Sequence, residues 1–242
     1  MSDAAAIVEG NVSRVRAEIA AACRRAGRDP ADVTLIGVTK SVDRPVADAL
    51  IAAGVRDIAE NRVQDAVEKF GRRSPFSPPP AAVRLHMIGN LQTNKARDVV
   101  ALFAMVHSVN RTAIADALQH EAIRQGVVLD VLLEVNVAED RAKQGADAGD
   151  ACDLHGYVVK NCDHLRLRGL MTIAAQVTDP EDARVAFRSL RALRDTLVEA
   201  NPSHSLPILS MGMSNDYPIA IEEGATHIRV GRALFAGLPS PG

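Results

Sequence analysis

Residues 33–55 read VTLIGVTKSVDRPVADALIAAGV, and this one stretch shows how the chain is organised. It opens with an apolar run rich in β-branched residues that ends in Thr-Lys, a pattern typical of a buried strand. Asp43 and Pro45 then signal the start of a helix, and Gly54 marks its end. Val55 begins the next apolar run. The stretch predicts a strand, a helix and a second strand, the unit from which parallel sheets are built.

The same alternation recurs along the chain. Apolar runs, each followed by a segment of helical character, lie at 33–38, 55–58, 84–88, 105–109, 128–137, 165–173, 207–210 and 226–230. Eight such units in about 210 residues predict an α/β fold, a closed (β/α)8 TIM-type barrel, which typically takes about 250 residues. A doubly wound open sheet is the alternative, but Gly-Val-Thr-Lys stands where that fold carries its glycine-rich turn.

The pattern predicts a single domain over residues 1–242, with an extra helix within 1–28 and the barrel within 33–238. Two later apolar stripes predict buried helix faces, at positions 187, 190, 193 and 197 and at positions 114, 118 and 123. Asp179, followed by Pro180, is the expected N-cap of the first of these helices, and Gly126 ends the second.

Composition excludes several classes of function. Twenty-eight Lys and Arg against thirty Asp and Glu leave a net charge of −2, which argues against a nucleic-acid partner. Five Phe, two Tyr and no Trp are too few for a base-stacking surface. Cys23, Cys152 and Cys162 have no metal-binding spacing, so we expect no metal site and a reducing compartment. The sequence shows no signal peptide and no apolar run near ~18 residues, so we expect a cytoplasmic protein without membrane contact.

Function in such a barrel lies where the strands end, and the first predicted strand ends at Lys40. The chain has five lysines among its 28 basic residues, so a lysine at this place is unusual for it. A lysine, unlike an arginine, loses its proton readily enough to attack a carbonyl. A solvated lysine at a strand end is the plainer alternative.

The end of the chain offers a complementary feature. Ser210 and Gly212 follow the seventh apolar run, and Gly231 is expected to open a last helix after the eighth. Glycine lets a phosphate approach the backbone, and loops after strands seven and eight commonly bind phosphate in this fold. These glycines also suit ordinary turns. Together with Lys40, they predict a site for a phosphorylated aldehyde, and pyridoxal 5′-phosphate (PLP) is the obvious candidate.

Arg229 lies on the eighth apolar run, between Ile228 and Val230. Side chains alternate along a strand, so this guanidinium is expected to point into the mouth of the barrel. There it would keep the pyridine nitrogen of the cofactor unprotonated, because two positive groups repel. An arginine in a strand-end salt bridge is the alternative.

Six blocks in order give the chain a specific resemblance. They are GVTKS at 37–41, AENRVQD at 59–65, HMIGNLQTNK at 86–95, RLRGLMTI at 166–173, SMGMSND at 210–216 and IRVGRALF at 228–235. With these blocks the chain resembles the pyridoxal phosphate homeostasis proteins, single-domain relatives of the alanine racemase barrel, over nearly its whole length.

The resemblance implies a role for each residue that matches a block. Lys40 would hold PLP as an internal aldimine, Asn61 would lie near the ring, and Arg229 would face the pyridine nitrogen. The remaining implied cofactor contacts are Met171, Ser210, Gly212 and Gly231, the last three at the phosphate.

The resemblance also implies rim residues that govern cofactor transfer or partners, matched by His86, Asn94, Lys95, Lys143 and Gly145. The chain departs from the family pattern in two places. Ala59 stands where the second block usually begins with glycine. Arg232 stands where threonine or serine is usual, which exchanges a hydroxyl for a cation.

Three functions follow from these observations. The resemblance implies a monomeric PLP-binding protein that keeps and delivers the cofactor, with apo PLP-dependent enzymes as recipients and no robust catalysis of its own. A one-base PLP-dependent amino-acid racemase is the alternative, and a cofactor-free binding protein is a third. A two-base racemase needs a tyrosine from an extra domain, for which we expect no room in this length. Tyr157 and Tyr217 are the two tyrosines, and Tyr157 falls mid-helix by pattern.

Overall fold

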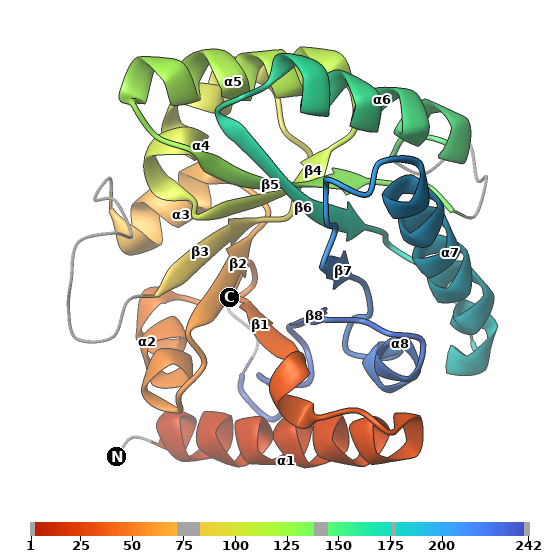
Figure 1. Cartoon of the computed structure of the whole chain (residues 1–242). Coiled ribbons are helices and arrows are strands. Elements are labelled where there is room, and N and C mark those ends of the chain that lie inside the picture. The colour runs from red at the N-terminus through yellow and green to blue at the C-terminus, as the bar shows by residue number, and fades with distance from the viewer. Residues whose placement is uncertain (1–2, 72–82, 138–144, 176–177, 240–242) are drawn as a thin grey trace.

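The computed structural model describes residues 3–71, 83–137, 145–175 and 178–239. Eight parallel strands follow one another in chain order around a closed barrel, and β8 pairs with β1 (Figure 1). The predicted barrel is therefore confirmed. The strands are β1 (Thr34–Val38), β2 (Asp57–Glu60), β3 (Arg84–Met87), β4 (Met105–Val109), β5 (Leu129–Glu134), β6 (Leu165–Met171), β7 (Ile208–Ser210) and β8 (His227–Val230).

The helices form a ring around the strands, as Figure 1 shows. They are α1 (Asp3–Ala26), α2 (Arg44–Ala52), α3 (Val63–Phe70), α4 (Ala96–Leu102), α5 (Thr112–Gln125), α6 (Ala148–Asn161), α7 (Arg184–Ala200) and α8 (Tyr217–Glu222). Three short 3₁₀ turns are η1 (Pro30–Asp32), η2 (Thr93–Lys95) and η3 (Pro180–Ala183).

Helix α1 closes this ring between α2 and α8 (Figure 1). Residues 231–239, after β8, form turns, so the prediction that Gly231 opens a helix is wrong. The reason lies far away in the sequence. Asn11 on α1 donates from Nδ2 to the carbonyl oxygens of Leu234 (3.1 Å) and Ala236 (2.9 Å). Helix α1 thus occupies the place of a helix after β8 and binds carbonyls that such a helix would use.

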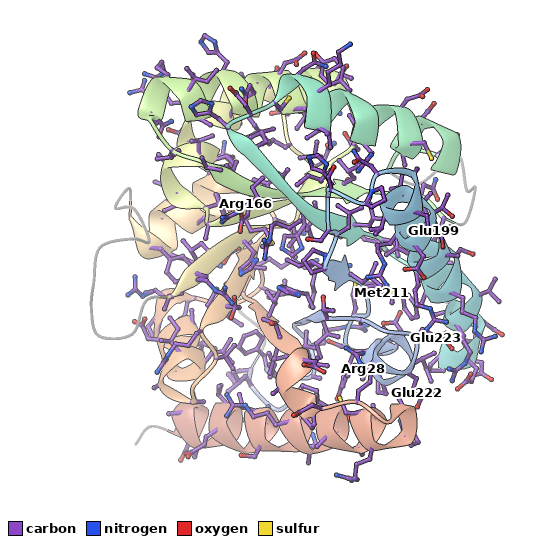
Figure 2. The ribbon with its side chains drawn as sticks, viewed as in Figure 1. Arg28, Arg166, Glu199, Met211, Glu222 and Glu223 are labelled. Atoms are coloured by element: carbon purple, nitrogen blue, oxygen red, sulfur yellow. The ribbon has the colours of Figure 1, made fainter. Side chains whose placement is uncertain are left out.

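Ion pairs at the end of α8 support this closure. Arg25 on α1 pairs with Glu222 (2.6 Å), and Arg184 at the start of α7 pairs with both Glu222 and Glu223 (2.8 Å each). Arg28 donates to the carbonyl of Ile221 (2.7 Å). Figure 2 shows Arg28, Glu222 and Glu223 gathered at this corner. Helices α1 and α7 are therefore both joined to the end of α8 by ion pairs.

The local signals in the sequence mostly decide where helices begin and end. Asp43 caps α2 by accepting from the amide of Val46, and Gly126 ends α5 in the left-handed region at φ 67°. Asp179 caps the turn η3, so the helix expected there begins five residues later. Ile123 is 53% exposed, contrary to its expected place in the buried stripe. A step of four from position 118 reaches Ala122, which is buried and leaves its neighbour facing solvent.

The inside of the barrel is partly apolar and partly polar. Met105, Leu132, Met171 and Ile208 form one interior cluster. His86 and His107 are buried beside each other, with ring centroids 5.2 Å apart. In the described parts of the chain no helix is long and apolar enough to cross a membrane, and no group of His, Cys, Asp and Glu could hold a metal ion.

Candidate cofactor site at the carboxyl ends of the strands

A cavity of about 410 Å³ opens at the carboxyl ends of the strands. Four of the predicted site residues line it together: Lys40, Asn61, Arg229 and Gly231. They come from the ends of β1, β2 and β8, which the closed barrel brings to one face. The structure therefore gathers in one place a lysine and an arginine that lie 189 positions apart in the sequence.

Lys40 has an exposed side chain on a firmly held backbone. The preceding residue, Thr39, donates from its amide to the carbonyl of Ala59 (3.0 Å) and from Oγ1 to Glu60 Oε1 (2.6 Å). Lys69 donates from Nζ to the carbonyl of Thr39 (2.6 Å) and to the same Glu60 oxygen (2.9 Å). Lys40 also borders a second cavity of about 460 Å³, so its side chain is reached from two sides.

Asn61 is positioned by a close approach of two loops. A Cβ added to Gly89, after β3, would lie 2.1 Å from the backbone oxygen of Asn61, so only glycine fits there. Ser108 fixes the same loop by donating from Oγ to the carbonyl of Gly89 (2.6 Å). The backbone of β3's loop therefore supports the asparagine at the edge of the cavity.

Arg229 brings a buried cation to the cavity. Its side chain is 3% exposed and donates to Ser210 Oγ (2.8 Å) and to the carbonyl of Thr172 (2.9 Å). Burial lowers the pKa of Arg229 to about 10, while the carboxylates of Asp216 and Glu134 act in the opposite direction. The group stays protonated at neutral pH. Among the described residues it makes no ion pair within 4 Å.

The turn after β8 presents backbone amides suited to an anion. The amides of Gly231 and Ala233 both donate to Ser214 Oγ, at 3.3 and 3.4 Å. These are long bonds to a neutral oxygen, and an anionic oxygen accepts such bonds more strongly. Ser214 and the exposed Arg232 line the same cavity. A hydroxyl, two amides and a guanidinium therefore form a set of donors that fits a phosphate group.

Two predicted cofactor contacts lie inside the barrel and do not line the cavity. Ser210 and Met171 are fully buried. Ser210 Oγ binds Arg229 and the Nδ1 atom of His107 (2.9 Å), and Met171 packs in the interior apolar cluster. The reason is strand alternation: both residues end their strands with side chains directed inward. The structure therefore does not support direct contact of either side chain with a cofactor in this cavity.

Gly212 also has a structural role. It is buried at φ 91°, and an added Cβ would lie 2.6 Å from the Cβ of Ala220 on α8. This glycine lets the loop after β7 lie against α8. Ser214, two residues further along, reaches the cavity together with Met213, Asn215 and Asp216. The signal for it is its place in the loop, past the end of the strand.

The expected rim residues separate in space. His86 is buried inside the barrel, where it binds Asp57 and His107. Asn94 and Lys95 lie in η2 and do not line the cavity. Gly145 packs against the chain just after β5, where an added Cβ would lie 2.6 Å from the amide nitrogen of Asn136. Lys143 lies outside the described residues.

Apolar residues form the remaining walls, which the sequence analysis did not single out. Ile88, Ile173 and Met213 line the cavity, and Ile173 is 43% exposed there. Asp216 also lines it and accepts from the amide of Met213 (2.5 Å). Burial raises the pKa of Asp216, against the opposing effects of the Met213 amide and the Arg229 charge. The cavity is thus apolar at its sides and cationic at its floor and rim.

Fold and site together define a class: a lysine-bearing (β/α)8 barrel of the alanine racemase type. The model of the family "Alanine racemase, N-terminal domain" matches residues 11–239. A pyridoxal phosphate homeostasis protein of Pseudomonas aeruginosa is 39% identical over 225 residues, which are 93% of each chain. One from Aquifex aeolicus is 38% identical over 224 residues, 93% of this chain and 95% of that one.

A solved structure agrees with these relatives. PipY of Synechococcus elongatus, whose structure has PLP bound, is 31% identical and superposes with a TM-score of 0.79. The match covers 95% of this chain and all of that one. The chain belongs to the pyridoxal phosphate homeostasis proteins.

Proposed function

We propose that the chain binds PLP in the 410 Å³ cavity, attached covalently through Lys40, and keeps and delivers the cofactor without robust catalysis of its own. One observation carries this proposal. The cavity brings together an exposed lysine, a buried cation and a set of phosphate-binding donors, which are the three kinds of group that PLP requires. The relatives that bear the name of homeostasis proteins, and PLP in the PipY structure, support it.

The residues divide between the two ends of the cofactor. Ser214 Oγ and the amides of Gly231 and Ala233 would hold the phosphate, with Arg232 adding a positive charge. Arg229 would lie at the ring nitrogen and Asn61 beside the ring. When bound, PLP supplies an aldehyde that condenses with a primary amine and a ring that withdraws electrons from the product.

Weak catalysis follows from what surrounds the lysine. A cation at the ring nitrogen opposes protonation of that nitrogen, so the ring withdraws electrons less strongly. The two tyrosines are committed elsewhere: Tyr157 Oη donates to Asp116 (2.7 Å), and Tyr217 Oη donates to Glu18. Neither lines the cavity. Lys40 is therefore left to move a proton without a tyrosine on the opposite face.

The alternative is a one-base amino-acid racemase in which Lys40 moves the α-proton. Asp216 also lines the cavity, and burial raises the pKa of its carboxyl group. Steady exchange of the α-proton of alanine with deuterium from the solvent, lost in Lys40→Ala, would favour the racemase. Exchange no faster than with free PLP would favour the carrier.

We further propose that the chain acts as a monomer in the cytoplasm and gives PLP to apo-enzymes. Lys40 borders a second cavity, which leaves it accessible to an incoming group, and the three cysteines are unpaired, as in a reducing compartment. Light scattering on the eluted protein tests the monomer. Recovery of activity by an apo-enzyme mixed with the loaded protein tests delivery.

The decisive experiment is the visible absorbance of the protein after incubation with PLP. We expect a band in wild type that Lys40→Ala abolishes and Lys160→Arg, a change at an exposed lysine on α6, leaves intact. Borohydride reduction and peptide mapping should locate the label on Lys40. A colourless wild-type protein, or an unchanged band in Lys40→Ala, would refute the proposal.

A further inference from the structure

A column of hydrogen bonds crosses the interior of the barrel and ends at Arg229. Asp57 Oδ1 binds His86 Nε2 (2.9 Å), and His86 Nδ1 binds His107 Nε2 (3.0 Å). His107 Nδ1 binds Ser210 Oγ (2.9 Å), which accepts from Arg229 (2.8 Å). None of the five residues is more than 7% exposed. They come from β2, β3, β4, β7 and β8, so the column spans the barrel from one side to the other.

The two ends of the column decide where its protons lie. A guanidinium only donates and a carboxylate only accepts. Ser210 Oγ accepts from Arg229, and among the described residues its other partner is His107, so its proton goes to His107 Nδ1. His107 then carries its own proton on Nε2 and donates to His86 Nδ1. His86 in turn donates from Nε2 to Asp57. One arrangement of protons therefore satisfies every member.

Burial and the surrounding groups keep the His107 imidazole neutral. Burial holds the pKa of His107 well below 6.5, and the positive charges of His86, Arg229 and His227 act in the same direction. Burial would raise the pKa of Asp57, but the His86 hydrogen bond and the charges of His86, Arg84 and His227 bring it below its usual value. Arg84 pairs with Asp57 at 2.7 Å. Asp57, the hydrogen-bond acceptor at the end of the column, therefore stays ionised.

We propose that Asp57, His86, His107 and Ser210 form a positioning relay that holds the Arg229 guanidinium in place for the ring nitrogen of bound PLP. The inference rests on the proposed function. Because Arg229 lacks a carboxylate partner within 4 Å among the described residues, its orientation depends on neutral acceptors. Ser210 Oγ is free to accept from Arg229 because its own proton is taken by His107. The two histidines act through Ser210 and touch neither cofactor nor lysine.

The relay has one way to fail. If His107 carries a proton on Nδ1, it becomes a donor toward Ser210, and the serine must direct its own proton elsewhere. Among the described residues Ser210 Oγ has no third hydrogen-bond partner to accept that proton. The hydroxyl proton would then point toward the Arg229 guanidinium and weaken its hydrogen bond to Ser210. The state of a histidine on β4 therefore controls the placement of an arginine on β8.

The first test uses the protein without cofactor. Long-range ¹H–¹⁵N correlation spectra of ¹⁵N-histidine-labelled protein report which ring nitrogen carries the proton. We expect His107 to be neutral, with its proton on Nε2, throughout pH 6–8, and His86 to carry a proton on the Nε2 atom that faces Asp57. A proton on Nδ1 of His107, or titration of His107 near pH 6.5, would overturn the relay. This measurement needs no variant, so it decides even if a variant fails to fold.

The second test measures PLP binding by the visible band. We expect His107→Phe and Ser210→Ala to weaken binding about tenfold and to move the pH dependence of the band, whereas Ser210→Thr, which keeps the hydroxyl, restores both. Ser189→Ala removes an exposed hydroxyl on α7 that donates to the carbonyl of Val185, away from the column, and should change neither. Wild-type affinity and pH profile in both relay variants would refute the relay alone. Absence of the band in wild type would refute the proposed function.

Discussion

Replacing Gly89 with alanine should disturb the site by a distance that the structure defines. The added Cβ would lie 2.1 Å from the backbone oxygen of Asn61 and 2.8 Å from its Cα, whereas real Cβ atoms essentially never approach below 3.0 Å. Both contacts are with backbone, so a side-chain rotation does not relieve them. The loops after β2 and β3 must separate by about 1 Å, and overpacking of this kind costs about 1–3 kcal/mol.

The same movement carries Asn61 away from the cavity. We expect Gly89→Ala to lower the free energy of unfolding in urea by about 2 kcal/mol and to weaken PLP binding about tenfold. Gly10→Ala is the matched control. Gly10 lies within α1 with nothing within 4 Å of its added Cβ, so alanine there should raise the free energy of unfolding by roughly 0.5–1 kcal/mol. A change below about 0.5 kcal/mol in Gly89→Ala, with unchanged PLP affinity, would refute the reasoning.

Three further predictions concern protons, phosphate and α8. Burial and the charges of His86 and Arg84 lower the pKa of His227 to about 4, against the opposing effect of Asp57. The free energy of unfolding should therefore be at its full value above pH 6.5 and fall by about 3 kcal/mol toward pH 4, because the unfolded chain binds this proton more readily. Urea titrations across this range should show a smaller fall in His227→Gln, and a flat profile in wild type would contradict the prediction. Ser214→Ala should weaken binding of PLP about tenfold but leave pyridoxal, which lacks the phosphate, unaffected; equal losses for both would exclude the phosphate contact. Gly212→Ala should lower the free energy of unfolding by more than about 2 kcal/mol, because it combines a positive φ with a 2.6 Å contact to Ala220, and a near-neutral result would mean that α8 moves freely.

Local signals explain why the fold is predictable from the sequence. Asp43 accepts from the amide of Val46, and Gly126 takes the left-handed conformation that ends α5. Both effects act within a few residues, so they can be predicted without the structure. The absence of a helix after β8 is different in kind. It depends on Asn11, which binds the carbonyl of Leu234 from 223 residues away. No pattern within residues 231–239 contains that information.

The residues of the candidate site also divide into those that the sequence predicts and those that depend on distant parts of the chain. Lys40, Asn61, Arg229 and Gly231 could be predicted because strand ends meet at one face of any parallel barrel. Ser210 was expected at the phosphate, but whether the last residue of a strand points inward or outward depends on the register of its neighbours. The side chain pairs with Arg229 instead.

The column behind Ser210 shows why such polar interiors escape sequence reasoning. His86 and His107 lie on different strands, and either one alone is an ordinary buried histidine. Their role becomes visible only when β2, β3, β4 and β7 bring a carboxylate, two rings and a hydroxyl into hydrogen-bond distance. The order of donors and acceptors, not the identity of any one residue, carries the inference.

The two ends of the cavity differ in a way that suits a protein that both keeps and releases a cofactor. Arg229 is buried and held by hydrogen bonds to Ser210 and Thr172, so in the proposed carrier we expect the ring end of the site to be ordered before PLP binds. Lys40 and Arg232 are exposed, and Lys40 borders a second cavity, so the covalent and phosphate ends remain open to an incoming amine. An enzyme gains by enclosing both ends, since water and competing amines then stay out. A carrier gains by enclosing only the end that sets affinity, because transfer needs access to the bond at the lysine.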